Sequence, residues 1–204
     1  MPFMKKILLL LFLLPAIGVL AQSKEYTASV EAYHKEQNDF YSDPEKSPLT
    51  PSDLKKFKGH EYFPIDASYR IEAELIRRPD ALPFLMKTST DRTPTYILYG
   101  VARFELQGKP IELEIYRNME IMHLPQYKDY LFLPFTDETN GLESYGGGRY
   151  MELSVPEGDT IVLDFNKTYN PYCAYNARYS CPIPPKANNI QLAIKAGIKL
   201  DKHK

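Results

Sequence analysis

The stretch Thr95–Leu106, TYILYGVARFEL, decides the fold class. Its first half is apolar on both faces, which is typical of a strand that is buried on both sides, and its second half alternates apolar and charged side chains. Gln107-Gly-Lys-Pro110 predicts a tight hairpin turn, after which Ile111–Tyr116 alternates again. The sequence therefore predicts two antiparallel strands joined by a short turn.

Working outward from this hairpin, further short strands are expected on both sides. They lie at 69–77, 81–87, 130–135, 149–155, 160–165 and 189–194. Short strands separated by turn residues are typical of an antiparallel β barrel, roll or sandwich. A helix is expected at about 24–41, with Tyr26, Val30, Tyr33 and Gln37 near one stripe of its surface, and a long loop region without periodicity fills the C-terminal third. The expected class is mainly β, or α+β by content.

The composition limits both the domain organisation and the function. The chain has 204 residues, 44% hydrophobic, with 25 Lys and Arg against 26 Asp and Glu. This size predicts a single globular domain over residues 22–204, with its β part at about 60–199. The near-neutral charge disfavours nucleic-acid binding, which usually shows a basic face.

The first 21 residues, MPFMKKILLLLFLLPAIGVLA, are typical of a secretory signal peptide. Two lysines precede the apolar run Ile7–Leu20, and the small residues Val19 and Ala21 precede the expected cut before Gln22. The run is shorter than the roughly 20 apolar residues of a membrane-spanning helix. No cysteine lies near the cut. We expect an exported, soluble chain in the periplasm or outside the cell, without a membrane segment and not a lipoprotein.

The glycine-rich turn is the first candidate site. Three successive glycines, Gly146, Gly147 and Gly148, stand between Tyr145 and Arg149. Glycines allow positive φ, and their N–H groups can form a concave anion site, to which the guanidinium adds a charged fork. This predicts a small polar or anionic ligand. The alternative is a structural turn leading into the next strand.

The second candidate is the segment 164–185, DFNKTYNPYCAYNARYSCPIPP, which is dense in tyrosine and asparagine. In one interpretation Asn166, Tyr169, Asn170 and Tyr175 line a pocket, where the tyrosines stack on an apolar or sugar face. In the other, these side chains satisfy the backbone of a packed loop. The sequence leaves both interpretations open.

The two cysteines, Cys173 and Cys181, belong to the same segment. In an exported protein a disulfide is the expected state. The alternative is a thiol enzyme, with either cysteine as nucleophile, His123 or His60 as base, and the glycine amides as an oxyanion site. The histidines have no metal-ligand spacing, so neither a metal nor a cofactor is expected.

These motifs resemble a prokaryotic family that is known only as a domain of unknown function. The similar residues are YGGGRY at 145–150, DFN at 164–166, NPYCAY at 170–175 and CPIPP at 181–185. The resemblance implies no established activity, substrate or catalytic residue.

Three functions therefore stay open. The first is an exported small-ligand-binding or accessory protein of the cell envelope. The second is an envelope hydrolase or thiol-dependent enzyme. The third is a structural or interaction protein. The oligomeric state is not predicted.

Overall fold

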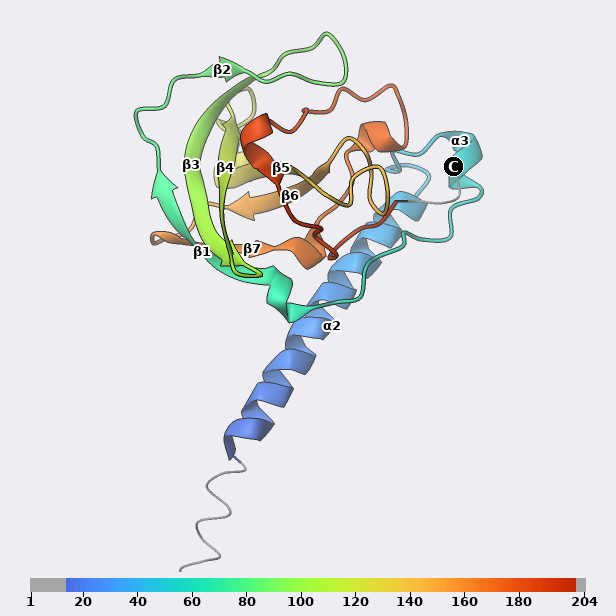
Figure 1. Cartoon of the computed structure of the whole chain (residues 1–204). Coiled ribbons are helices and arrows are strands. Elements are labelled where there is room, and N and C mark those ends of the chain that lie inside the picture. Colours follow the sequence, from blue (N-terminus) through green and yellow to red (C-terminus); the bar gives the residue numbers. More distant parts are fainter. Residues whose placement is uncertain (1–13, 201–204) are drawn as a thin grey trace, which may run out of the picture.

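The structure, a computed structural model, describes the backbone of residues 14–200 and the side chains of residues 23–200 (Figure 1). Most of the expected signal peptide, residues 1–21, lies outside this part. Among the described residues, no helix is long and apolar enough to cross a membrane.

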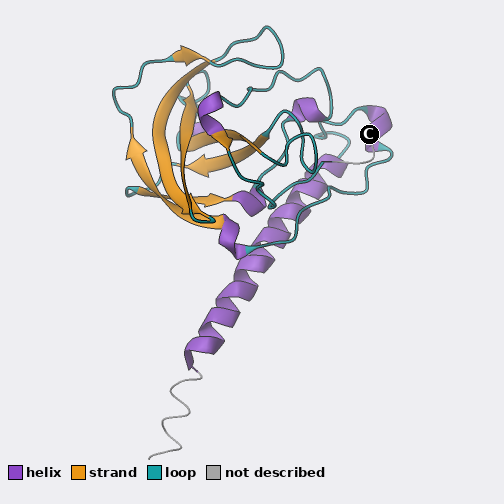
Figure 2. Ribbon diagram, in the orientation of Figure 1, coloured by secondary structure: helices purple, strands orange, loops and turns teal. Residues whose placement is uncertain are grey.

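An antiparallel sheet curved into half a barrel forms the body of the protein (Figures 1 and 2). Its strands follow the order β6-β5-β4-β3-β1-β7, while β2 pairs with β3 and β8 pairs in parallel with β5. The strands are β1 Arg70–Arg77, β2 Phe84–Leu85, β3 Thr95–Leu106, β4 Lys109–Asn118, β5 Tyr130–Asp137, β6 Arg149–Ser154, β7 Thr160–Asp164 and β8 Asn189–Ile190. The predicted mainly β class with an N-terminal helix is confirmed.

Helices are few in the described part of the chain. The long helix α2 covers Leu14–Ser42, and α3 covers Pro51–Leu54. Five single turns of 3₁₀ helix connect the strands and loops: η1 Ala67–Tyr69, η2 Pro125–Tyr127, η3 Phe165–Lys167, η4 Tyr172–Ala174 and η5 Lys186–Asn188.

A bulge in β3 explains why the first half of this strand is apolar on both faces. The pairing of β3 with β4 shifts between Leu98 and Gly100, so Tyr99 is the extra residue. Before the bulge, Tyr96 packs into a cluster on the outer face of the sheet, and after it Ala102 packs into the main core. Because of this shift, side chains of β3 pack into hydrophobic clusters on both faces of the sheet.

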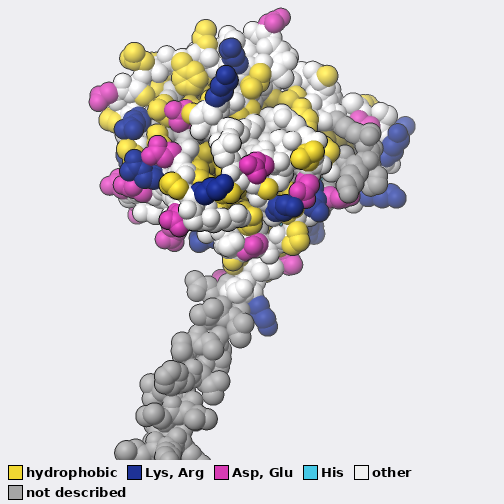
Figure 3. Space-filling model, in the orientation of Figure 1, with side chains coloured by type: hydrophobic (Ala, Val, Ile, Leu, Met, Phe, Trp, Pro, Cys, Tyr) yellow, Lys and Arg dark blue, Asp and Glu magenta, His cyan; other side chains and the backbone are white. Residues whose placement is uncertain are grey.

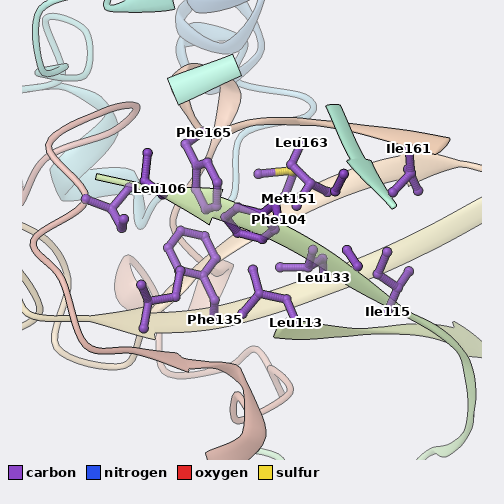
Figure 4. Packing of buried hydrophobic residues seen from close by; sticks show 14 of the residues in the cluster. Phe104, Leu106, Leu113, Ile115, Leu133, Phe135, Met151, Ile161, Leu163 and Phe165 are labelled. Atoms are coloured by element: carbon purple, nitrogen blue, oxygen red, sulfur yellow. The ribbon is translucent and has the colours of Figure 1, made fainter. Parts of the chain in front are cut away.

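The main core fills the concave side of the sheet (Figure 4). Phe104, Leu113, Leu133 and Phe135 point into it from neighbouring strands, as Figure 4 shows. The C-terminal segment 192–196 closes the core, and its Ile194 is fully buried. Each such side chain contributes about 1.5–3 kcal/mol of burial free energy, so this cluster is the main source of stability.

The outer face of the sheet carries a stripe of aromatic side chains. Tyr96, Tyr116, Phe132 and Tyr150 cross β3, β4, β5 and β6, and all are buried. The segment after β7 covers this stripe, and its Cys181 packs into it. The long loop predicted for the C-terminal third therefore forms a second layer over the sheet.

Helix α2 docks on the barrel through the face predicted from its apolar spacing. Val30 and Tyr41 are buried, whereas Lys35 faces solvent. The N-terminal end of the helix projects from the body (Figure 1). Charged side chains of both signs are interspersed over the face shown in Figure 3.

Candidate functional site

Arg149, the expected anion ligand, is fully buried and paired inside the protein. One terminal nitrogen, Nη2, donates to Oδ2 of Asp137 at 2.8 Å and to the carbonyl of Ile194 at 2.8 Å. The other, Nη1, donates to the carbonyls of Ala196 at 2.5 Å and Ile198 at 3.3 Å. Both charged side chains are 0% exposed. These contacts favour the structural alternative over an external anion ligand, because the residue ties the C-terminal segment to β5 and β6.

The carboxylate of Asp137 completes this internal network. Its Oδ1 accepts hydrogen bonds from the backbone N–H and the hydroxyl of Thr139, at 2.9 and 2.7 Å, and from the N–H of Ile194 at 3.2 Å. Burial lowers the pKa of Arg149, and the neighbouring carboxylate opposes that shift. The pair is thus a buried ion pair with several supporting hydrogen bonds.

At two of the three positions of the glycine turn, neighbouring atoms approach so closely that a side chain would collide with them. Gly148 has φ +90°, and a Cβ there would lie 2.5 Å from the carbonyl oxygen of Phe135. A Cβ on Gly147 would lie 2.5 Å from the ring of Tyr145, whereas a Cβ on Gly146 would lie 3.7 Å from the Cα of Gly141, the closest atom beyond its chain neighbours. These close approaches favour the structural interpretation of the turn.

The asparagine candidates are also internal. Asn166 is 0% exposed, and its Nδ2 donates to the hydroxyl of Tyr26 and to the carbonyl of Asp66, both at 2.8 Å. Asn170 is buried as well, and its Nδ2 donates to the hydroxyl of Tyr175 at 3.1 Å. Asn166, Asn170 and Tyr175 therefore hold the loop and α2 in place, which favours the interpretation of a packed loop over that of a ligand pocket.

Tyr145 and the two cysteines do come together, and we call this cluster the thiol site. It comprises Cys173, Cys181, Tyr145 and Ser89. The backbone N–H of Cys173 donates to Sγ of Cys181 at 3.1 Å, and both thiols are free. The backbone N–H of Cys181 donates to Oγ of Ser89 at 3.1 Å. The expected disulfide is not formed in this structure and stays a prediction.

Hydrogen bonding makes Cys173 the thiol that ionises first. The pKa of Cys173 is lowered to about 6, most strongly by its hydrogen bond with the Cys181 thiol and less by those with the hydroxyls of Ser89 and Tyr145. Partial burial of Cys173 opposes this shift. The pKa of Cys181 is raised instead, first by the hydrogen bond of this thiol to Cys173 and then by its burial. His60, one of the two expected bases, packs edge-on against Tyr41 with ring centroids 4.3 Å apart. The side chains that most activate Cys173 are therefore hydroxyls and a thiol.

A cavity of about 170 Å³ lies where α2, β6 and the loop after β7 meet, and we call it the tyrosine pocket. It is lined by Tyr33, Gln37, Phe40, Glu152, Tyr169 and Tyr172. Tyr169 is the one residue of the predicted ligand set in this lining.

Glu152 is the charged group of the tyrosine pocket. Its Oε1 accepts hydrogen bonds from the hydroxyls of Tyr169 at 2.9 Å and Tyr130 at 3.4 Å. Burial, and then the negative charge of Glu152, raise the pKa of Tyr33 and Tyr130. Within residues 23–200, no lysine, arginine or histidine forms an ion pair with Glu152. Glu152, an exposed carboxylate, is therefore the one charged side chain in the lining of this pocket.

Two further hollows lie nearby. One, of about 360 Å³, lies beside Glu152 and is bounded by η2 and the start of β5, including Lys128 and Tyr130. The other, of about 610 Å³, lies against the start of the described side chains and is lined mostly by polar residues such as Arg70 and Lys167. Neither combines several aromatic rings with a charged group as the tyrosine pocket does.

Residues 55–199 match the family described as "Protein of unknown function (DUF1684)". The chain belongs to this family. Among solved structures, it is similar to the solution structure of an uncharacterized protein from gene locus rrnAC0354 of Haloarcula marismortui. The two are 33% identical with a TM-score of 0.69, over 90% of this chain and 99% of the other. No curated protein matches the chain with significance.

The family match confirms the resemblance expected from the loop motifs. Because the family's description assigns no activity, the chemistry has to be argued from the site itself. The thiol site and the Glu152 side of the tyrosine pocket fall inside the matched range, and α2 precedes it.

Proposed function

We propose that the mature chain is an exported protein that binds a small ligand, and that the tyrosine pocket is its binding site. The observation that carries this proposal is the lining of the cavity: four aromatic rings around a single carboxylate. Small-ligand sites are typically concave and apolar, with a few convergent polar groups that fix orientation. A cavity of about 170 Å³ suits a compact ligand rather than a polymer.

Ligand-observed NMR on the mature chain, with mixtures of small metabolites, tests this proposal. Gln37→Trp places a large ring in the pocket from α2, so we expect this variant to lose the binding signals. Lys35→Trp introduces the same ring on the solvent-facing side of α2, where the side chain is 75% exposed, and serves as the matched control. Binding that survives Gln37→Trp would place the ligand site elsewhere, and the absence of any ligand would contradict the function.

The export part of the proposal rests on the N-terminal sequence. Expression of the full chain in a bacterial host, followed by N-terminal sequencing of the protein recovered from the periplasm or medium, tests it directly. We expect the mature chain to begin at Gln22. Recovery of uncleaved protein in the cytoplasmic fraction would contradict export.

Thiol chemistry is a second candidate function, favoured by the convergence of two thiols and two hydroxyls at the thiol site. In an oxidising compartment Cys173 and Cys181 would lose two protons and two electrons to a disulfide-class oxidant and form a disulfide. Alkylation of the denatured, unreduced mature protein, followed by intact mass, counts the free thiols. No added label would mean a disulfide, and two labels would mean that the activated thiol of Cys173 is retained.

A further inference from the structure

We infer that the ligand of the tyrosine pocket is a small organic cation, such as a methylated ammonium group. This inference rests on the proposed function and adds the chemical class of the ligand. It is argued from three features of the described residues: an unpaired carboxylate, aromatic rings that surround the cavity, and the absence of a positive charge in its lining.

The carboxylate of Glu152 is held in place but not neutralised. Two tyrosine hydroxyls, from Tyr169 and Tyr130, donate to the same oxygen, Oε1. Neutral donors orient a carboxylate without cancelling its charge. A cation in the cavity would supply an ionic partner, and among the described residues no donor to the other oxygen, Oε2, competes with it.

The rings provide the second component of cation recognition. Phe40 and Tyr172 lie nearly parallel, with an interplanar angle of 18° and centroids 6.4 Å apart. Tyr33 and Tyr169 line the same cavity. A cation within about 6 Å of an aromatic centroid is attracted by the negative face of the ring, and aromatic cages of this kind recognise quaternary ammonium groups.

The charges around the pocket disfavour an anion. Glu36 adds its negative charge to that of Glu152 at the hydroxyl of Tyr33, and both raise the pKa of that hydroxyl. Lys128, the cation in the lining of the neighbouring hollow, is paired with Asp129 at 3.7 Å. With Arg149 buried elsewhere, the anionic ligand expected from the sequence has no positive group in this lining.

Titration of the isotope-labelled mature chain with choline, followed by NMR, tests the cation. Its uncharged isostere 3,3-dimethylbutan-1-ol has the same shape without the charge. We expect choline to shift the signals of the pocket residues and the isostere to bind at least about tenfold more weakly, because it gains neither the carboxylate nor the rings as charge partners. Equal binding of the two would overturn the inference.

Variants separate the roles of the charge and the rings. Glu152→Gln keeps the shape and removes the charge, so we expect choline affinity to fall at least about tenfold, whereas the matched control Glu105→Gln, on exposed β3 surface, leaves it unchanged. Tyr172→Leu removes a ring and weakens binding about threefold or more, and Tyr172→Phe retains it. Unchanged affinity in Glu152→Gln would refute the inference.

A further arm separates this inference from the proposed function. Methyl glucoside is an uncharged ligand that stacks on aromatic rings. If it shifts the pocket signals and choline does not, the pocket binds a small ligand but the cation is wrong. If neither these probes nor the metabolite mixtures shift them, both proposals fail.

Discussion

Replacing Arg149 with methionine tests whether this residue is structural, as its contacts indicate, or a ligand group, as the sequence suggests. Methionine has a similar length and no charge, so it fills the space but leaves Asp137 without its partner. The carbonyls of Ile194, Ala196 and Ile198 lose their donor at the same time.

The expected cost follows from these contacts. Breaking a buried ion pair by removing one partner costs about 3–5 kcal/mol. Buried acceptors left unsatisfied add to this, so we expect a loss of about 5 kcal/mol or more. For a domain of this size, each kcal/mol shifts Tm by about 2–4 °C, which predicts a decrease of about 10–20 °C.

Urea unfolding of the mature chain, followed by circular dichroism, measures this loss. Arg103→Met is the matched control, because Arg103 pairs with Glu112 on the surface, where an ion pair contributes at most about 1 kcal/mol. A loss below about 1 kcal/mol in Arg149→Met, together with weaker ligand binding, would refute the structural role and restore the ligand interpretation.

Three further predictions concern the thiol site, the glycine turn and the docking of α2. Alkylation of Cys173 in the reduced protein should accelerate as pH rises from 5 to 7, with its midpoint near 6, because the thiolate is the reactive form; Cys181→Ala, which removes the donor, should move this midpoint upward. Gly148→Ala should cost about 2–3 kcal/mol in thermal unfolding, because of its φ of +90° and the nearby β5 carbonyl, whereas Gly146→Ala should be nearly neutral. Asn166→Asp loses the hydrogen bonds that Nδ2 donates to Tyr26, Asp66 and Asp164, and it places a second carboxylate beside that of Asp164, so it should cost about 2–3 kcal/mol and speed hydrogen exchange in α2.

Much of the fold could be predicted because it depends on local patterns. The alternation in Thr95–Leu106 and the turn that follows it specify a hairpin whatever surrounds them, and the observed β3 has the predicted bounds. Gln107 and Gly108 have the positive φ values that a two-residue hairpin turn requires. The apolar spacing of α2 likewise predicted its docked face, including the buried Val30.

The site was harder to predict because its partners are distant in the sequence. A guanidinium beside glycines suggests an exposed anion site, and nothing local indicates that Asp137 and the carbonyls of 194–198 will enclose it. The tyrosine pocket takes its lining from α2, β6 and the loop after β7. Among the predicted ligand residues, Tyr169 lines this pocket, and no local signal distinguished Glu152 from other exposed carboxylates.

The attachment of α2 has a consequence for the order of events during synthesis. Tyr26 and His34 are held by hydrogen bonds to Asp164 and Asn166, which lie 132 to 140 positions later in the chain. The helix leaves the ribosome first, yet its anchoring residues leave among the last. Because most helix stability in proteins comes from tertiary packing, α2 gains a fixed position only after most of the chain has emerged. The fold around α2 can therefore be completed only late in synthesis, after the η3 turn at Phe165–Lys167 has left the ribosome.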